Sequence, residues 1–138
     1  FAGKAREQAG ELFAKACLAE DKQAPSDVRL QTERGRFRRA PVVIAVVNRF
    51  IEKPGVPEVE QILSTGAATF NLCLAANAMG FGTCWITEWI AYSPTVGTGL
   101  GLAGNERIAG FVYIGQAAER QDDRSRPNLE DLVTYWQG

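Results

Sequence analysis

The residue types that carry most hydrolytic and metal chemistry are scarce in this chain of 138 residues. It contains no histidine, which excludes a Ser-His or Cys-His relay and most zinc sites, and its acidic residues lack the spacing of metal ligands. Its three cysteines, Cys17, Cys73 and Cys84, form no CxxC pair, and we expect buried, inert thiols in a reducing cytoplasm. Any chemistry is therefore expected to come from a bound cofactor.

Two segments have a composition that could meet a phosphate group. Several arginines lie close together in the polar segment 21–39, which Pro25 interrupts. They leave two alternatives open, a phosphate contact or, as we expect, a solvated or mobile loop. The sequence GTGLG at 97–101 is rich in glycine, but it does not follow a predicted strand and lacks the GxGxxG spacing. Neither segment predicts a cofactor site by itself.

The longest apolar stretch, 59–87, should position any site. Apolar residues over 59–79 follow helical spacing on one face and small residues fill the others, which predicts a long helix that is buried on several sides. Gly80 suits the left-handed residue that closes a helix, and the β-branched and aromatic residues at 83–87 predict a short strand. Asparagines within the helix and acidic residues beside it argue against a membrane span, so we expect no membrane association.

The other expected elements surround this unit. An amphipathic helix is predicted over 2–20, and Ser93 with the proline after it predicts the start of a short helix. Two apolar, β-branched runs predict buried strands at 40–47 and 108–114, and the first of these should be central in the sheet. The tail from residue 117 to the end carries apolar residues in its last part, which we expect to contact a second subunit.

Composition places these elements in one domain, 1–138. A content of 46% hydrophobic and 22% charged residues is that of a globular chain able to bury a core. The formal net charge of −1 gives no electrostatic footprint for nucleic acid, so nucleic-acid binding is not expected. The order of helices and strands predicts an α+β fold with a central mixed or antiparallel sheet flanked by helices.

The chain contains, in this order, the segments APVVIAVV, GAATFNLCLAANAMGFGTCWIT, AYSP and ERIAGFVYIG. Together they resemble the nitroreductase family, in its branch of small, YdjA-like subunits. The resemblance implies a nitroreductase-like fold and an FMN-dependent homodimer with flavin at the subunit interface. It also implies that NADH or NADPH supplies hydride, and that nitroaromatic compounds, quinones or related small-molecule acceptors take the electrons in a ping-pong exchange.

The same resemblance implies two groups of site residues. Trp85, Ile86 and Thr87 should lie against FMN that is bound mainly by the other subunit, and an indole wall, a hydroxyl and backbone donors suit a flavin. The segment near the nicotinamide nucleotide would comprise Ala75, Ala76, Asn77, Ala78, Met79 and Gly80. Close helix packing also explains these alanines, and a role as a core aromatic also explains Trp85, so both alternatives stay open. No catalytic residue and no metal ligand is assigned.

Two features depart from the family pattern. The basic, serine-containing segment for the FMN phosphate would precede Phe1, so we expect the chain to lack the N-terminal part of the family domain. Glu88 stands where many relatives carry glycine, which puts the local loop shape in question. A second hypothesis therefore stays open, a flavin-free dimeric binding or structural module on the same fold. The sequence leaves the physiological acceptor and the choice between NADH and NADPH undetermined.

Overall fold

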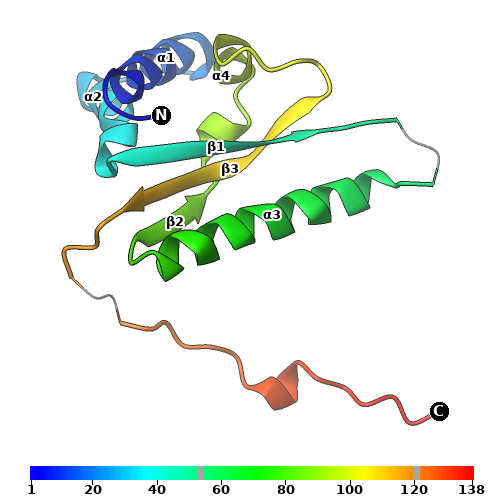
Figure 1. Ribbon diagram of the computed structural model, residues 1–138. Coiled ribbons are helices and arrows are strands. Elements are labelled where there is room, and N and C mark those ends of the chain that lie inside the picture. Colours follow the sequence, from blue (N-terminus) through cyan, green and yellow to red (C-terminus); the bar gives the residue numbers. More distant parts are fainter. Residues whose placement is uncertain (53–54, 120–121) are drawn as a thin grey trace.

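The sheet that organises the fold has three antiparallel strands (Figure 1). The computed structural model describes residues 1–52, 55–119 and 122–138. The strands β1 Val42–Arg49, β2 Gly82–Ile86 and β3 Glu106–Gly115 lie in the order β1-β3-β2. The predicted α+β class is confirmed, with an antiparallel sheet.

The first apolar run, predicted to be central, forms an edge strand instead, so this prediction is wrong. β3 is the central strand, and its residues 110–113 are buried one after another. The outer edge of β1 is not left free at its start, because Ala2 forms a bridge with Val42 and the backbone N–H of Val43 donates to the carbonyl of Phe1 at 3.0 Å. Pairing of this edge lets an apolar strand lie there.

One face of the sheet carries the packed core. It is covered by α1 Lys4–Glu20, by α2 Asp27–Gly35 and by the 3-10 turn η1 Arg36–Arg39. Phe37 lies at its centre, with its ring centroid 4.7 Å from that of Phe13 and 5.2 Å from that of Phe111. All three side chains are fully buried. Edge-to-face and tilted contacts of this kind add to the gain from apolar burial.

The segment 21–39 was expected as a loop. This expectation is wrong for residues 27–39, which form α2 and η1, whereas residues 21–26 lie outside helices and strands. Ser26 caps α2 by accepting the backbone N–H of Arg29 at 3.2 Å. Glu33 and Arg36 are buried and paired with each other, with Nε–Oε2 and Nη2–Oε1 distances of 2.5 Å. Phe37, which directly follows Arg36, is also fully buried, and the burial of these three side chains orders a segment whose charge suggested solvent.

The long helix α3 Glu58–Ala78 runs along the opposite side of the sheet (Figure 1). Its end is confirmed as a Schellman motif: Gly80 has φ 86° and donates to Asn77 O at 2.9 Å, and Phe81 N donates to Ala76 O at 3.0 Å. Its expected burial on several sides is wrong within this chain. Only Thr69 and Ala76 of α3 are buried. None of the helices in the described part of the chain is long and apolar enough to cross a membrane.

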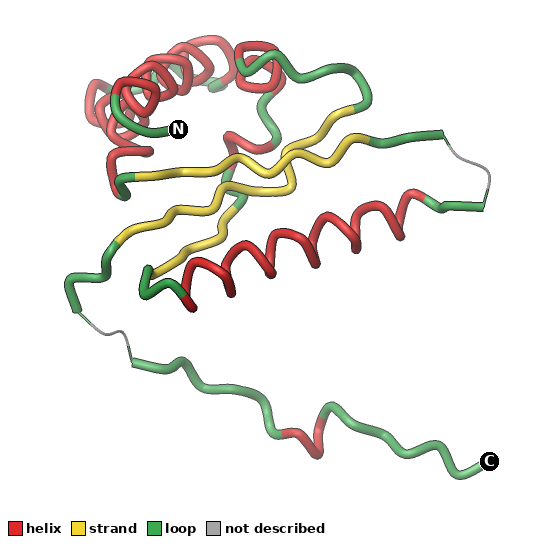
Figure 2. The backbone as a smooth tube through the Cα atoms, viewed as in Figure 1, coloured by secondary structure: helices red, strands yellow, loops and turns green. Residues whose placement is uncertain are grey.

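Short elements complete the described chain. The turn η2 Trp89–Ala91 and the helix α4 Pro94–Gly99 follow β2, and Ser93 caps α4 by accepting Val96 N–H at 3.1 Å, as predicted. After β3 the tail runs clear of the sheet and contains the turn η3 Leu129–Asp131 (Figures 1 and 2). Its apolar residues are exposed, and their contact with a second subunit stays a prediction.

Candidate functional site

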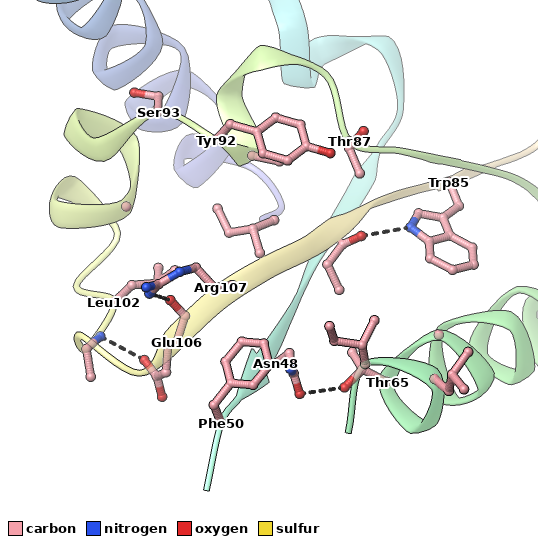
Figure 3. Close-up of a pocket in the computed structure, with 18 of the residues that line it drawn as sticks. Asn48, Phe50, Thr65, Trp85, Thr87, Tyr92, Ser93, Leu102, Glu106 and Arg107 are labelled. Atoms are coloured by element: carbon pink, nitrogen blue, oxygen red, sulfur yellow. Dashed lines mark hydrogen bonds between the residues drawn. The ribbon is translucent and has the colours of Figure 1, made fainter. Parts of the chain in front are cut away.

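A groove of about 1360 Å³ lies between α3 and the sheet, at the side where η2 and α4 leave β2 (Figure 3). Small-molecule sites usually measure about 300–1,000 Å³, so the groove has room for a nucleotide-sized molecule. Its apolar lining on α3 includes Ile62, Leu63 and Phe70. Polar side chains reach it from the sheet and from the loops beyond η2.

The C-terminal end of β2 separates the three predicted flavin residues. Trp85 and Thr87 line the groove, whereas Ile86 packs against the core on the other face, as the alternation of a strand requires. Trp85 is 40% exposed and its indole N–H points at Ala109 O, 3.4 Å away (Figure 3). The structure therefore brings two of the three residues to one groove wall, and their contact with flavin stays a prediction.

An irregularity in β3 makes room for Trp85. The register with β1 shifts between Val46 and Val47, so that Ala109 has no partner on β1 and its carbonyl is free to meet the indole. A Cβ on Gly110 would lie 2.2 Å from the indole Nε1, closer than side chains pack. Only glycine fits at position 110 beside an indole in this place.

Asn48 is a groove residue that the sequence reasoning missed. It is 8% exposed, and Thr65 Oγ1 donates to its Oδ1 at 2.8 Å (Figure 3). Its Nδ2 has no hydrogen-bond partner among the described residues, and such a buried donor is costly unless a ligand or water accepts from it. The available signal was a lone asparagine directly after the apolar run 40–47.

Two neighbouring charged residues line the groove where β3 begins. Glu106 accepts from the backbone N–H of Ala103 at 2.9 Å and from Arg49 Nε at 2.9 Å, and these contacts lower the pKa of its carboxyl. Arg107 donates to the carbonyl of Gly104 at 2.8 Å and to that of Glu106 at 2.7 Å, the latter drawn in Figure 3. The groove thus contains a fixed guanidinium beside a carboxylate whose own charge is already paired.

The turn between β2 and η2 has an unusual backbone. Glu88 has φ 54° and is the only non-glycine residue with positive φ in the described ranges. Its carboxylate pairs with Arg36 and lies 3.9 Å from Arg39 Nη1. Burial tends to raise the pKa of Glu33 behind this pair, but hydrogen bonds and charge from Arg36 outweigh it, so the pKa is lowered. The shape of this loop, questioned from the sequence, is one that glycine would adopt.

The predicted nicotinamide segment lies elsewhere. Ala75 to Gly80 form the last turn and the cap of α3, and none of these residues lines the groove. Ala76 is buried whereas Met79 is 74% exposed. The Asn77 side chain donates to Thr83 Oγ1 at 3.0 Å and so ties the helix end to β2. Close packing within the chain therefore applies to Ala76 alone, since the other five residues are exposed, and contact of the segment with a nicotinamide nucleotide stays a prediction.

The thiols and the acidic residues offer no second site. Cys17 is buried and its pKa is raised, chiefly by that burial. Cys73 is half-buried and Cys84 is exposed on β2, so the expectation of buried thiols is wrong for Cys84. Alternation puts Cys84 on the same face of β2 as Ile86, opposite Tyr113, but β2 is an edge strand and Cys84 lies outside the core cluster on that face. Within the described ranges, no group of three or more Cys, Asp or Glu residues could hold a metal ion.

Comparisons with known proteins agree on one family. The profile described as "Nitroreductase family" matches residues 2–116. An Escherichia coli protein named "Putative NAD(P)H nitroreductase YdjA" is 32% identical over 135 residues, which are 97% of this chain and 72% of that protein. A nitroreductase-like family protein from Bacillus cereus has a TM-score of 0.81 at 20% identity, over 100% of this chain and 71% of that one.

A second solved structure is a variant of NfnB, an FMN and NADPH-dependent nitroreductase from Sphigopyxis sp. strain HMH. It has a TM-score of 0.73 at 19% identity and covers 100% of this chain and 77% of that one. At 20% and 19% identity the two solved structures show a shared fold alone. The family relationship rests on the family profile and on the match to the Escherichia coli protein.

Proposed function

The chain belongs to the nitroreductase family of oxidoreductases, and from that premise we propose that the protein is an FMN-dependent NAD(P)H oxidoreductase acting on small electron acceptors. The names of its relatives support both cofactors, since one is called an NAD(P)H nitroreductase and another is FMN- and NADPH-dependent. Nitroaromatic compounds, quinones and related acceptors are the proposed substrates. When bound, FMN supplies the two-electron chemistry for which the chain itself has no groups.

The observation that carries this proposal is the groove beside Trp85. It is large and mostly apolar, it has an indole in its wall, and the buried amide N–H of Asn48 has no partner there. A flat heteroaromatic ring with carbonyl and ring-nitrogen acceptors on one edge fits such a lining. The residues present therefore fit a flavin, and the cation of Arg107 suits its anionic part.

Each of these residues has a defined task in the proposal. Trp85 provides an apolar wall against which an aromatic ring can lie, and Asn48 donates a hydrogen bond to an acceptor on its edge. The Thr87 hydroxyl, on the same wall as Trp85, offers a further polar contact. Together they orient the ring and keep water from one of its sides.

We infer a homodimer from the apolar surface that α3 exposes. Ile62, Leu63, Phe70 and Leu74 are each at least half exposed, although they belong to the most apolar helix of the chain. The tail adds exposed Tyr135 and Trp136. A second copy of the chain would remove both surfaces from water, and obligate interfaces are commonly this apolar. Sedimentation of the complete protein at micromolar concentration is expected to show a dimer, and a stable monomer would contradict this inference.

The direct test uses the complete protein encoded by the gene. It is expected to purify yellow or to take up FMN, and to oxidise NADH or NADPH when a nitroaromatic compound or a quinone is added. The control is the same assay without acceptor. A protein that stays colourless and cannot be loaded with FMN would overturn the proposal and support the flavin-free module instead.

A further inference from the structure

We propose that Glu88 is a positioning residue, whose ion pair with Arg36 holds the turn between β2 and η2 in a left-handed conformation and thereby fixes Trp85 and Thr87 in the groove wall. The consequence for flavin rests on the proposed function. The consequence for the backbone does not, because it can be measured on the protein without cofactor.

The backbone at Glu88 is the first step of the argument. With φ 54° and ψ 179°, Glu88 adopts a conformation that glycine enters freely and residues with a Cβ avoid. Such a conformation persists only where surrounding contacts hold it. The Glu88 carbonyl contributes one weak backbone contact, accepting Ala91 N–H at 3.3 Å, so the side chain is the part of Glu88 that must supply the rest.

The second step is the rigidity of the partner. Arg36 is 4% exposed, and two of its nitrogens donate to the fully buried carboxylate of Glu33 at 2.5 Å. Arg36 Nη1, which is directed away from Glu33, binds Glu88. The position of the Arg36 guanidinium is therefore fixed by Glu33 and does not depend on Glu88. Arg29 binds Glu33 at 2.6 Å and places its guanidinium 5.3 Å from the ring centre of Trp89, so the network also holds the residue after Glu88.

The third step connects the turn with the groove. Thr87 on one side of Glu88 lines the groove, and so do Ala91 and Tyr92 on the other side (Figure 3). Ile86 and Ile90 fix the same turn to the core on its opposite face. If φ of Glu88 changed sign, the peptide planes on both sides would rotate, and Thr87 would move relative to Tyr92 and Trp85. The ion-pair network of Arg29, Glu33 and Arg36 is therefore connected to the groove wall through Glu88.

The test compares three substitutions at this position in the complete protein. Glu88→Ala removes the ion pair and keeps the Cβ, which makes the positive φ unfavourable. Glu88→Gly removes the ion pair and the Cβ together, so that the same φ is adopted without strain. Glu88→Gln keeps a hydrogen bond to Arg36 without the charge. A matched control is Glu11→Ala, which removes the exposed ion pair between Glu11 and Arg34.

Two measurements are made on each variant. Hydrogen exchange of the apo protein is expected to rise in the amides of residues 87–92 for Glu88→Ala, and to stay near wild type for Glu88→Gly and Glu11→Ala. FMN titration is expected to show a Kd that is roughly tenfold higher for Glu88→Ala and within about threefold of wild type for Glu88→Gly, with Glu88→Gln between them.

The outcomes separate positioning from a merely stabilising ion pair. Equal losses in Glu88→Ala and Glu88→Gly, or an unchanged exchange and Kd in Glu88→Ala, overturn the inference. If the wild-type protein takes up no FMN, the proposed function fails by itself, and the exchange pattern alone then decides whether Glu88 holds the turn.

Discussion

The two faces of the sheet carry similar apolar residues, but these residues are buried on one face and exposed on the other. On the face covered by α1 and η1, Phe13, Phe37 and Phe111 are buried completely. On the face along α3, Phe70 and Leu63 stay more than half exposed. The first face completes its core with residues from this chain, whereas the second presents apolar surface and a groove. Hydrophobic composition alone therefore does not show what a helix packs against.

The largest expected effect on the free energy of unfolding comes from replacing one phenylalanine on each face of the sheet. Phe37→Ala should lower the free energy of unfolding by about 3–5 kcal/mol, independently of protein concentration, because its cavity lies inside one chain. Phe70→Ala should instead lower the free energy of unfolding by an amount that grows as the protein is diluted. The reason is that Phe70 belongs to the surface that a second copy of the chain would bury. Denaturant unfolding at several protein concentrations measures both. A loss for Phe70→Ala that ignores concentration would remove the contrast.

The next effect belongs to the buried ion pair of the packed face. Glu33→Gln leaves Arg36 without its main partner and should cost about 3 kcal/mol at neutral pH. The pKa of Glu33 is lowered in the folded protein, so its contribution is complete above the unfolded value of 4.5 and is lost as the pH falls through the folded pKa. In unfolding titrations from pH 7 to pH 3, the difference between wild type and Glu33→Gln should therefore begin to narrow below about pH 4.5. A constant gap down to pH 3 would contradict this assignment.

Two glycines test the same contrast at a smaller scale. A Cβ on Gly10 would lie 2.2 Å from the carbonyl oxygen of Arg34, whereas a Cβ on Gly66 would meet nothing within 4 Å. Gly10→Ala should destabilise the protein by at least about 1–3 kcal/mol, because the backbones of α1 and α2 must move apart. Gly66→Ala, in the interior of α3, should stabilise it by up to about 1 kcal/mol. Thermal unfolding of the two variants should give shifts of opposite sign, and equal shifts would show that both helices pack alike.

The last comparison concerns Trp85, on the open face, where the main expected effect is on flavin binding and not on stability. Trp85→Ala should cost less than the 3–5 kcal/mol typical of a core aromatic, because the indole is 40% exposed. It should nevertheless weaken FMN binding, while Trp85→Phe keeps both the fold and the flavin. The FMN dissociation constant is measured beside the thermal midpoint in the complete protein. A large loss of stability with unaltered flavin affinity would assign Trp85 to the core alone.

Local chemistry explains what could be predicted at the site. Composition predicted a short strand at 83–87, and the family resemblance put Trp85, Ile86 and Thr87 together against FMN. The structure has β2 at Gly82–Ile86, and only Trp85 and Thr87 of the three line the groove. Asn48 could not be placed there from the sequence, because its role depends on Thr65 and on the far side of the groove. The buried partner of Glu88 could not be identified for the same reason, since Arg36 is 52 residues away in the sequence.

The sequence by itself determined the features that depend on neighbours a few residues apart. The Schellman end at Gly80, the cap at Ser93 and the approximate positions of the three strands follow from backbone preferences and short-range hydrogen bonds. The family was also accessible, because its segments occur in order along the chain.

Only the tertiary structure decided which surfaces meet. It placed β3 in the centre of the sheet, buried Glu33, Arg36 and Phe37 of the charged segment 21–39 and left α3 largely exposed. Each of these outcomes is set by contacts between distant residues, and an apolar run has the same composition whether it faces a sheet, a cofactor or a second copy of the chain. The physical reason is that burial is a property of the assembled surfaces, which local spacing does not specify.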